Sequence, residues 1–473
     1  MKKKNGTEDY STKGAVAYSF GQLSLITAYQ SFSFLVFTFY FAVVIIDVNL
    51  ITIGYLIWTV WNAFNDPIMG YLSDRTHTKY GRRRPYIMIF LIPLALTMFF
   101  LFFAPISYGI TNQFSNFIYF VIIILIFEFC YTTYDINLSS MFPEIFISEE
   151  SRIKANNIRQ IFTIVGLIFA FILPSFFITN LSDPTALPDY HFYGAMMIIL
   201  ITVIGLIFLK FTPRERLEFQ EDYIGVPGFF ESFKICLKSR SFRWAVPAFI
   251  GAFFIESIFP TIVPLFGKYV LNIGEGETLI LSLLLGVTFI SAAIFINFLW
   301  TPLTKKIGVR MMWIISSIIW LITMIPILFI SDRWSGLIVF FLFGIGLGGS
   351  LYAKVLVISD IIDEDELNTG TRRDASYFSI YIFFLRVGYI FVFLSINLVF
   401  NSVGWRIFEP ETVTMAHIMG LRLLASLFPA IALIFVIFAM YRYPLHGDYL
   451  KSVQKKVKEI HSEKKNKIKT RQN

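Results

Sequence analysis

The stretch NAFNDPIMGYLSDRT, which runs from Asn62 to Thr76, decides the class of this protein. Asp66 lies inside a segment that is otherwise apolar enough to cross a lipid bilayer. The segment then ends in a loop that carries five cations between positions 73 and 85. A carboxylate at membrane depth is costly, and it is rarely kept without a function. We therefore expect Asp66 to bind a cation, and we expect the chain to be a membrane carrier.

The composition indicates a polytopic helical membrane protein. Hydrophobic residues make up 56% of the 473 residues and charged residues only 15%, with a mean hydropathy of +0.67. Repeated apolar runs are long enough to cross the roughly 30 Å of hydrocarbon in a bilayer. We predict twelve spans, at 15–46, 50–73, 86–107, 116–143, 156–179, 190–210, 244–271, 278–302, 309–331, 335–358, 376–401 and 414–441.

The net charge of +8 is distributed like that of a membrane protein and not like that of a nucleic-acid binder. Of the 40 Lys and Arg residues, 32 lie at the termini or in loops on the same side, and only Arg333 and Arg406 lie in loops on the other side. This bias places both termini in the cytoplasm and the chain in the cell membrane. We expect the Lys-rich tail at 451–471 to be solvated near anionic lipid headgroups or, alternatively, to bind a partner.

The longest polar segment inside the chain divides it into two sets of six spans. We expect an N-terminal bundle over 1–212, a central cytoplasmic linker over 213–243, a C-terminal bundle over 244–443 and a basic tail over 444–473. Within the linker, the pattern at 227–238 predicts a short amphipathic helix on the membrane surface. Two six-span repeats fit a transporter whose halves rock about a site near the bilayer midplane.

Polar residues in three predicted spans repeat at intervals of three and four, which places each set on one helical face. Faces of this kind avoid lipid, so the three sets should line a shared interior. They are Tyr55, Thr59, Asn62, Asp66, Gly70 and Ser73 in the second span, Glu128, Thr132, Asp135 and Ser139 in the fourth, and Asn156, Arg159, Thr163 and Gly166 in the fifth.

Asp66 and Asp135 each have two interpretations. Asp66 either forms a structural ion pair that fixes helix packing or binds Na⁺ or H⁺. In the second case Asn62 is a further oxygen ligand, because hard cations prefer carboxylate, carbonyl and amide oxygens. Pro67 removes an N–H and can free a carbonyl nearby. Asp135 either pairs with Arg159, or shares with it the binding of substrate hydroxyls, or alternates between cation and substrate.

Two further charges need partners. Glu128 either approaches the outer half of the cavity or is a buried, protonated acid. Arg386 is the only charge between Asp374 and Arg406, so it needs an acid or a substrate beside it. We assign no role to four other charges in or near the spans, namely Glu256, Lys268, Lys354 and Arg422.

The loops on the cytoplasmic side contain two clusters of mixed charge that are candidates for a cytoplasmic gate. Each cluster either latches this side shut through ion pairs or is simply solvated. The residues are Asp74, Arg75, Arg82, Arg84 and Glu144 in the first half, and Asp360, Asp363 and Arg372 in the second.

The sequence offers no support for an enzyme. It contains no Walker loop, no metal-ligand cluster, no HExxH motif and no nucleophile elbow. We expect no cofactor, and we expect the energy for uphill transport to come from a gradient of H⁺ or Na⁺.

Taken together, the motifs resemble the glycoside–pentoside–hexuronide:cation symporter family, a branch of the major facilitator superfamily that includes the melibiose permease. This resemblance implies an all-α fold of twelve transmembrane helices in two six-helix bundles, and cation-coupled transport by alternating access. Its anchors are the stretches 61–70, 81–85, 131–135 with Pro143, 360–373 and 447–450.

The resemblance also implies roles for individual residues. Asp66 matches the acid that binds the coupling cation, and Thr132 matches a hydroxyl near that cation. Asn62 stands where sodium-using members carry a second carboxylate, which weakens the case for tight Na⁺ binding and favours H⁺, or Na⁺ with lower affinity. The candidate cation site is therefore Asp66, Asn62, Thr132 and Asp135.

The candidate substrate site is formed by Asp135, Arg159, Arg386, Gln22 and Tyr131. Asp135 and Arg159 match the acid and the arginine of the sugar site, and Arg386 replaces the usual lysine. Sugar-binding members carry a Lys-Asp pair where this chain has Leu25-Ile26, so Gln22 and Gln30 would have to supply replacement hydrogen bonds.

Three functions remain open at this point. The first is symport of a sugar or glycoside-like solute by a monomer. The second is a lysophospholipid-type symporter, because the chain has 54 Phe and a cavity with few sugar-type polar groups. The third is a non-transporting membrane sensor of the same fold, although such a protein would not need to keep Asp66.

Overall fold

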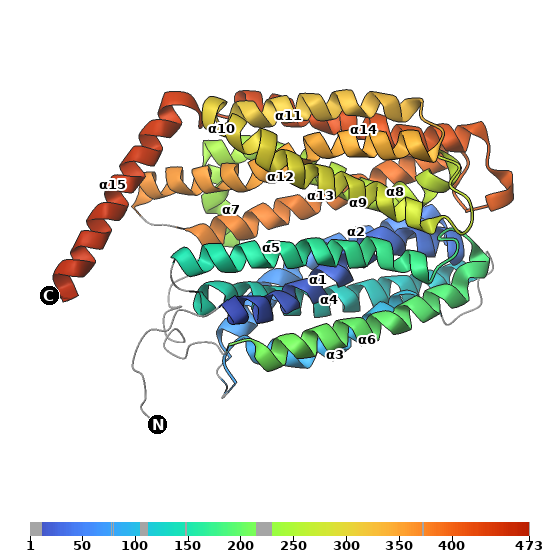
Figure 1. Cartoon of the computed structure of the whole chain (residues 1–473), viewed down its shortest axis with the longest axis horizontal. Coiled ribbons are helices and arrows are strands. Elements are labelled where there is room, and N and C mark those ends of the chain that lie inside the picture. Colours follow the sequence, from blue (N-terminus) through green and yellow to red (C-terminus); the bar gives the residue numbers. More distant parts are fainter. Residues whose placement is uncertain are drawn as a thin grey trace.

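The computed structural model describes residues 12–76, 78, 80–104, 112–146, 149–213, 229–370 and 373–472. Figure 1 shows a long bundle of helices, and none of the described residues forms a β-strand. The α-helices are α1 (Thr12–Thr38), α2 (Val48–Asp74), α3 (Arg84–Leu101), α4 (Gln113–Ile145), α5 (Glu149–Ile172), α6 (Leu187–Phe211), α7 (Phe229–Lys238), α8 (Arg240–Tyr269), α9 (Thr278–Phe295), α10 (Thr301–Ile307), α11 (Val309–Met324), α12 (Arg333–Thr369), α13 (Asp374–Ser402), α14 (Met415–Arg442) and α15 (Gly447–Gln472).

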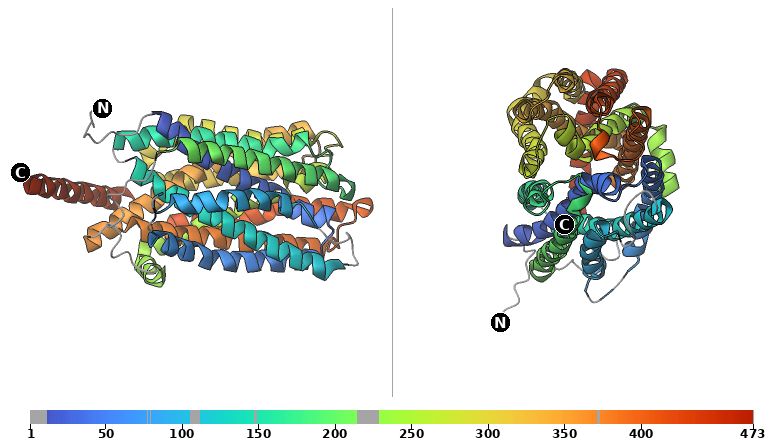
Figure 2. Two further views of the ribbon diagram at one scale, coloured as in Figure 1. Left: turned by 90° about the horizontal axis from the view of Figure 1, so that it is seen from below. Right: turned by 90° about the vertical axis from the view of Figure 1, so that its right-hand side faces the viewer.

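Twelve spans run through the described part of the chain, at the predicted places. Helices α1 to α6 form one half, and α8 to α14 form the other, with α9, the π-helix Ile296–Trp300 and α10 acting as one span. The end-on view in Figure 2 shows the two halves as separate groups of helices. The arrangement is that of the major facilitator fold.

Helix α2 differs from the other spans in its polarity. Among the described residues, eleven helical segments are long and apolar enough to cross a membrane by length and composition, and α2 is not one of them. At 27 residues it is about 40 Å long, which is enough to cross. Its polar stripe lowers its hydropathy, as expected for a helix that lines an interior.

Local sequence signals explain where several helices begin. Asp47 caps α2 by accepting a hydrogen bond from the backbone N–H of Asn49, and Asp332 caps α12 by accepting from Trp334 and Ser335. Helix α12 ends at Gly370, which adopts a left-handed conformation with φ of 73°. These caps satisfy backbone groups at the helix ends, where no intrahelical partner exists.

Glycines allow α12 to pack closely against its neighbours. A Cβ atom on Gly346 would lie 2.2 Å from the Cβ of Trp320 in α11, and one on Gly348 would lie 2.7 Å from the carbonyl oxygen of Ala292 in α9. Membrane helices use small residues in this way because lipid provides no hydrophobic driving force between helices, so close packing of their backbones holds them together.

Two helices, α7 and α15, lie outside the spans. The predicted amphipathic helix is present as α7, which packs on α13 through the Ser232–Ser376 hydrogen bond (2.9 Å) and the stacked rings of Phe233 and Phe384. The basic tail keeps its described lysines exposed, as expected for a solvated segment, but it forms a helix that was not predicted. It forms α15, and the buried side chain of Val453 anchors its first turns against the rest of the protein.

Both ends of the described chain lie on one side of the bundle. Helix α1 begins there, and α15 extends away from the bundle on that side (Figure 1). We call this the termini side.

We predict that Gly346→Ala destabilises the protein, because the added methyl group meets Trp320 in a packed interface. Overpacking of this kind costs about 1–3 kcal/mol, so the midpoint of thermal unfolding in detergent should fall by several degrees. The matched control is Gly286→Ala in α9, where an added Cβ has nothing within 4 Å. Equal midpoints for the two variants would contradict the packing argument.

Candidate functional site

Arg386 of α13 links the two halves in the interior of the bundle. Its Nη2 atom lies 3.1 Å from Oδ2 of Asp66 on α2, and its Nη1 atom lies 3.6 Å from Oε1 of Glu128 on α4. The same Nη1 group donates a hydrogen bond to the amide oxygen of Asn62. One guanidinium from the C-terminal half thus holds three side chains of the N-terminal half.

Thr132 brings the two acids together. Its hydroxyl oxygen lies 3.1 Å from Oδ1 of Asp66 and 3.2 Å from Oε1 of Glu128. The indole N–H of Trp58 donates to Oε2 of Glu128 at 3.1 Å. We name these five residues, Trp58, Asp66, Glu128, Thr132 and Arg386, the central cluster.

The acids of the central cluster differ in their exposure. The side chain of Asp66 is 26% exposed, whereas that of Glu128 is 1% exposed. The exposed apolar side chains of α2 lie along a different face, which suits contact with lipid; they are Ile53, Ile57, Val60, Trp61, Phe64, Ile68 and Leu72. Asp66 therefore points away from that apolar face, and its ion-paired carboxylate is partly exposed.

Asp66 forms the ion pair that the structural interpretation expects. The interpretation of Asp66 as a cation site stays a prediction. Of the predicted cation-site residues, Asn62 and Asp66 contact Arg386, and Thr132 contacts Asp66. Glu128, which sequence analysis left without an assigned role, joins them as a buried acid.

Asp135 and Arg159 lie outside the central cluster, and each has its own hydrogen-bond partner. Asp135 accepts a hydrogen bond from Ser139 (3.4 Å), and Arg159 donates to Asn156 (2.9 Å). The guanidinium of Arg159 also lies over the ring of Phe142, 4.9 Å from its centroid. Within the described part of the chain these two side chains form no ion pair with each other, so the structure does not bear out the pairing interpretation of Asp135.

Tyrosines form an aromatic wall beside these charges. The rings of Tyr131 and Tyr29 stack with centroids 4.7 Å apart, and the hydroxyl of Tyr29 lies 2.9 Å from that of Tyr389. Tyr131 was predicted, but the other two were not, because a tyrosine in an apolar run carries no distinct signal. Gln22 is partly buried in α1 and makes no hydrogen bond to any other described residue.

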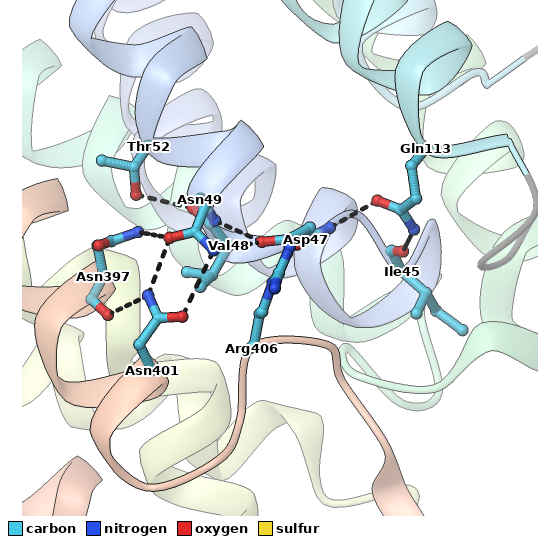
Figure 3. Close-up of polar contacts among 9 residues, drawn as sticks. All are labelled: Ile45, Asp47, Val48, Asn49, Thr52, Gln113, Asn397, Asn401 and Arg406. Atoms are coloured by element: carbon cyan, nitrogen blue, oxygen red, sulfur yellow. Dashed lines mark hydrogen bonds and ion pairs between the residues drawn. The ribbon is translucent and has the colours of Figure 1, made fainter.

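The side opposite the termini is closed by a polar contact between the halves, which we name the outer latch (Figure 3). Asp47 pairs with Arg406, and the backbone N–H of Val48 donates to the carbonyl of Arg406 at 3.0 Å. The amide oxygen of Asn49 accepts from Asn397 (2.9 Å) and Asn401 (3.0 Å).

The outer latch continues inward through an aromatic stack. The rings of Tyr55 and Phe393 lie 3.5 Å apart and nearly parallel, and the Thr52 hydroxyl lies 3.5 Å from the carbonyl oxygen of Phe393. A second contact joins the halves on the same side, where Thr278 donates to the carbonyl of Thr179 at 2.9 Å. These contacts close the outer side of the path to the central cluster.

The predicted gate on the termini side is only partly described. Arg84 donates to the carbonyls of Leu209 and Thr212 in its own half, and Asp360 accepts from Gln454 of α15 in its own half. The side chains of Asp74 and Glu144 and the whole of Arg372 lie outside the described residues. A latch across the halves that uses Arg75, Arg82 and Asp363 stays a prediction.

Comparisons with known proteins give the family. A family model described as MFS/sugar transport protein matches residues 17–447, and the chain belongs to this family. It is a secondary transporter of the major facilitator type that spans the membrane many times.

Three similar proteins illustrate the range of solutes for which proteins like this one are named. The isoprimeverose transporter of Lactiplantibacillus pentosus is 23% identical, over 74% of this chain and 71% of its own. The sodium-dependent lysophosphatidylcholine symporter 1 of Gallus gallus is 24% identical, over 69% and 66%. The crystal structure of the nucleoside transporter NupG shares the fold with a TM-score of 0.67 at 14% identity, covering 92% of this chain and 99% of that one.

We predict that Asp47→Asn loosens the outer latch, because the amide removes the charge that holds Arg406. Losing a partly exposed pair of this kind costs about 1 kcal/mol, which corresponds to about a fivefold rise in opening. The readout is the rate at which a membrane-impermeant maleimide labels a cysteine placed at Thr52, in a background without Cys130 and Cys236.

The control for the latch experiment is Glu277→Gln. It breaks an ion pair with Arg333 that lies on the same side but within one half of the protein. If both variants raised the labelling rate equally, the contact would not be a latch between the halves.

Proposed function

We propose that this protein is a proton-coupled symporter for a sugar or a glycoside-like solute. It lies in the cell membrane with the termini side in the cytoplasm, where most of its Lys and Arg residues gather. The observation that carries the proposal is the central cluster, in which one fixed cation bridges two acids across the interface between the moving halves.

The central cluster suggests how ion binding drives the conformational change. Arg386 holds Asp66 and Glu128 while the outer side is closed. A proton that neutralises one of these two acids weakens its ion pair with Arg386, because the attraction to the guanidinium depends on the negative charge. The halves can then separate on the outer side, so that loading and opening are coupled.

The solute site lies beside the cluster. Asp135 and Arg159 offer an acceptor and several donors, which suit the hydroxyl groups of a sugar. The stacked pair of Tyr29 and Tyr131 offers an aromatic face near these groups. Converging polar groups beside an aromatic wall are typical of a site for a small polar ligand.

Asn62 favours the proton as the coupling ion. Its amide oxygen already accepts a hydrogen bond from Arg386, and an amide brings no negative charge to a sodium site. Sodium needs several oxygen ligands at once, whereas a proton needs a single carboxylate. The central cluster therefore suits a proton better than a sodium ion.

A lysolipid carrier is the second candidate, since one similar protein is a lysophosphatidylcholine symporter. The sugar carrier is favoured because Asp135, Arg159 and the tyrosines form a polar, enclosed group. A lysolipid would instead need an apolar opening from the bilayer beside a headgroup partner.

We predict that Asp66→Ala abolishes accumulation driven by an ion gradient in proteoliposomes, because the accessible carboxylate is lost. The control is Asp183→Ala, which removes an acid from an exposed turn outside the spans. Undiminished uphill uptake by the Asp66 variant would refute the coupling role.

We predict that a pH gradient, acidic outside, drives uptake better than a Na⁺ gradient at constant pH. With one proton per solute, each pH unit supports about a tenfold accumulation. Uptake that strictly requires Na⁺ and ignores pH would show that the ion assignment is wrong.

Uptake assays in the same proteoliposomes distinguish the two candidate solute classes, sugars and lysolipids. We expect accumulation of one or more sugars from a panel of D-xylose, melibiose and isoprimeverose, and none of lysophosphatidylcholine. Uptake of the lysolipid alone would favour the second candidate.

A further inference from the structure

We propose that Glu128 carries the coupling proton and that Asp66 is the exposed acid through which the proton reaches it. The inference rests on the proposed function, and it assigns the proton to a residue that the coupling argument above does not need. Three observations carry it: the charge balance, the hydrogen bonds at Thr132 and the difference in burial.

The charge balance leaves one negative unit in excess. Three acids from α2 and α4 face two guanidiniums from α5 and α13; they are Asp66, Glu128 and Asp135 against Arg159 and Arg386. Arginine stays protonated in proteins. The other titratable groups that face Glu128 are the hydroxyls of Tyr29, Tyr131 and Tyr389, which are neutral. One bound proton neutralises the group.

The hydrogen bonds at Thr132 also call for one proton. The threonine hydroxyl has a single hydrogen to donate, yet its oxygen lies within hydrogen-bond distance of both Asp66 and Glu128. It can donate to one carboxylate. The second contact becomes a hydrogen bond when the other acid carries a proton and donates it to the hydroxyl oxygen.

Burial and partners assign the proton to Glu128. Its side chain is 1% exposed, and its nearest donors are the neutral Trp58 and Thr132, at 3.1 and 3.2 Å. Asp66 is more exposed and lies closer to Arg386, at 3.1 Å against 3.6 Å for Glu128. A charged acid is favoured beside the guanidinium and water, and a neutral acid in the buried site.

The same geometry supplies a path for the proton. A proton that binds Asp66 passes to the oxygen of Thr132, while the hydroxyl hydrogen of Thr132 passes to Oε1 of Glu128. One O–H bond breaks and one forms at each transfer, and the total charge is unchanged. Asp66 then regains its negative charge, and the ion pair that the bound proton weakens is the one between Glu128 and Arg386.

Glu128 supplies the negative charge beside Arg386 that Asn62 cannot supply. Both side chains contact Nη1 of Arg386, but the amide of Asn62 is uncharged. The second carboxylate of this protein comes from α4.

The direct test is infrared spectroscopy of the purified protein in liposomes during a pH titration, with no solute present. The wild type should show the carbonyl band of a protonated carboxylic acid. Glu128→Gln should lose it, Asp66→Asn should keep it, and Glu277→Gln, an acid outside the spans, should also keep it. Glutamine preserves the size of the side chain and an acceptor for Trp58.

Several results would overturn the assignment. They are a wild type without the band at any pH, a band that persists in Glu128→Gln, and a band that only Asp66→Asn removes. Circular dichroism and thermal unfolding identify a variant that has failed to fold. In that case Glu128→Asp, which keeps the acid and should shift the band, replaces the glutamine variant.

A transport experiment separates this inference from the proposed function. With the sugar that the wild type accumulates, Glu128→Gln should lower the accumulation ratio from about tenfold per pH unit to one, while solute exchange without a gradient persists. The double variant Asn62→Asp/Glu128→Gln, which moves the carboxylate to α2, should regain ion-driven accumulation.

Normal proton-driven accumulation by Glu128→Gln would overturn the assignment and leave the symporter standing. A wild type that no proton gradient drives would contradict the proposed function itself.

Discussion

The central constraint on this protein is the burial of one guanidinium between two acids at the interface of its two halves. Arg386 reaches from α13 to Asp66 and Glu128, and none of the three is stable alone at membrane depth. The polar stripe of α2, the hydroxyl of Thr132 and the indole of Trp58 provide polar contacts to these charged groups. A structure organised in this way responds strongly to the addition of one positive charge.

The outer latch and the central cluster join the same two helices, α2 and α13, at different depths. The outer latch uses Asp47 with Arg406 and Asn49 with Asn397 and Asn401, and the cluster uses Asp66 with Arg386. Because both contacts lie along this helix pair or in the residues that flank it, a change in charge at the central cluster acts on the same two helices that the outer latch holds together. This gives a physical route from ion binding to opening.

Much of the fold and part of the site could be predicted from the sequence, but the partners of the charges could not. Apolar run lengths located the twelve spans, and spacing placed Asn62 and Asp66 on one face. Spacing gives no information about which helix lies opposite, so the pairing of Arg386 with Asp66 and Glu128 stayed open. The packing of α15 was also missed, because two valines in a Lys-rich segment are a weak signal.

The sequence by itself determined that this protein crosses the membrane, where each helix runs and that an acid sits at bilayer depth. Those properties depend on local hydropathy and on periods of three and four residues. Only the tertiary structure decided that Glu128 shares one hydroxyl with Asp66, that Arg159 does not pair with Asp135, and that Tyr29 meets Tyr389. These are contacts between distant segments, and their geometry depends on how whole helices pack.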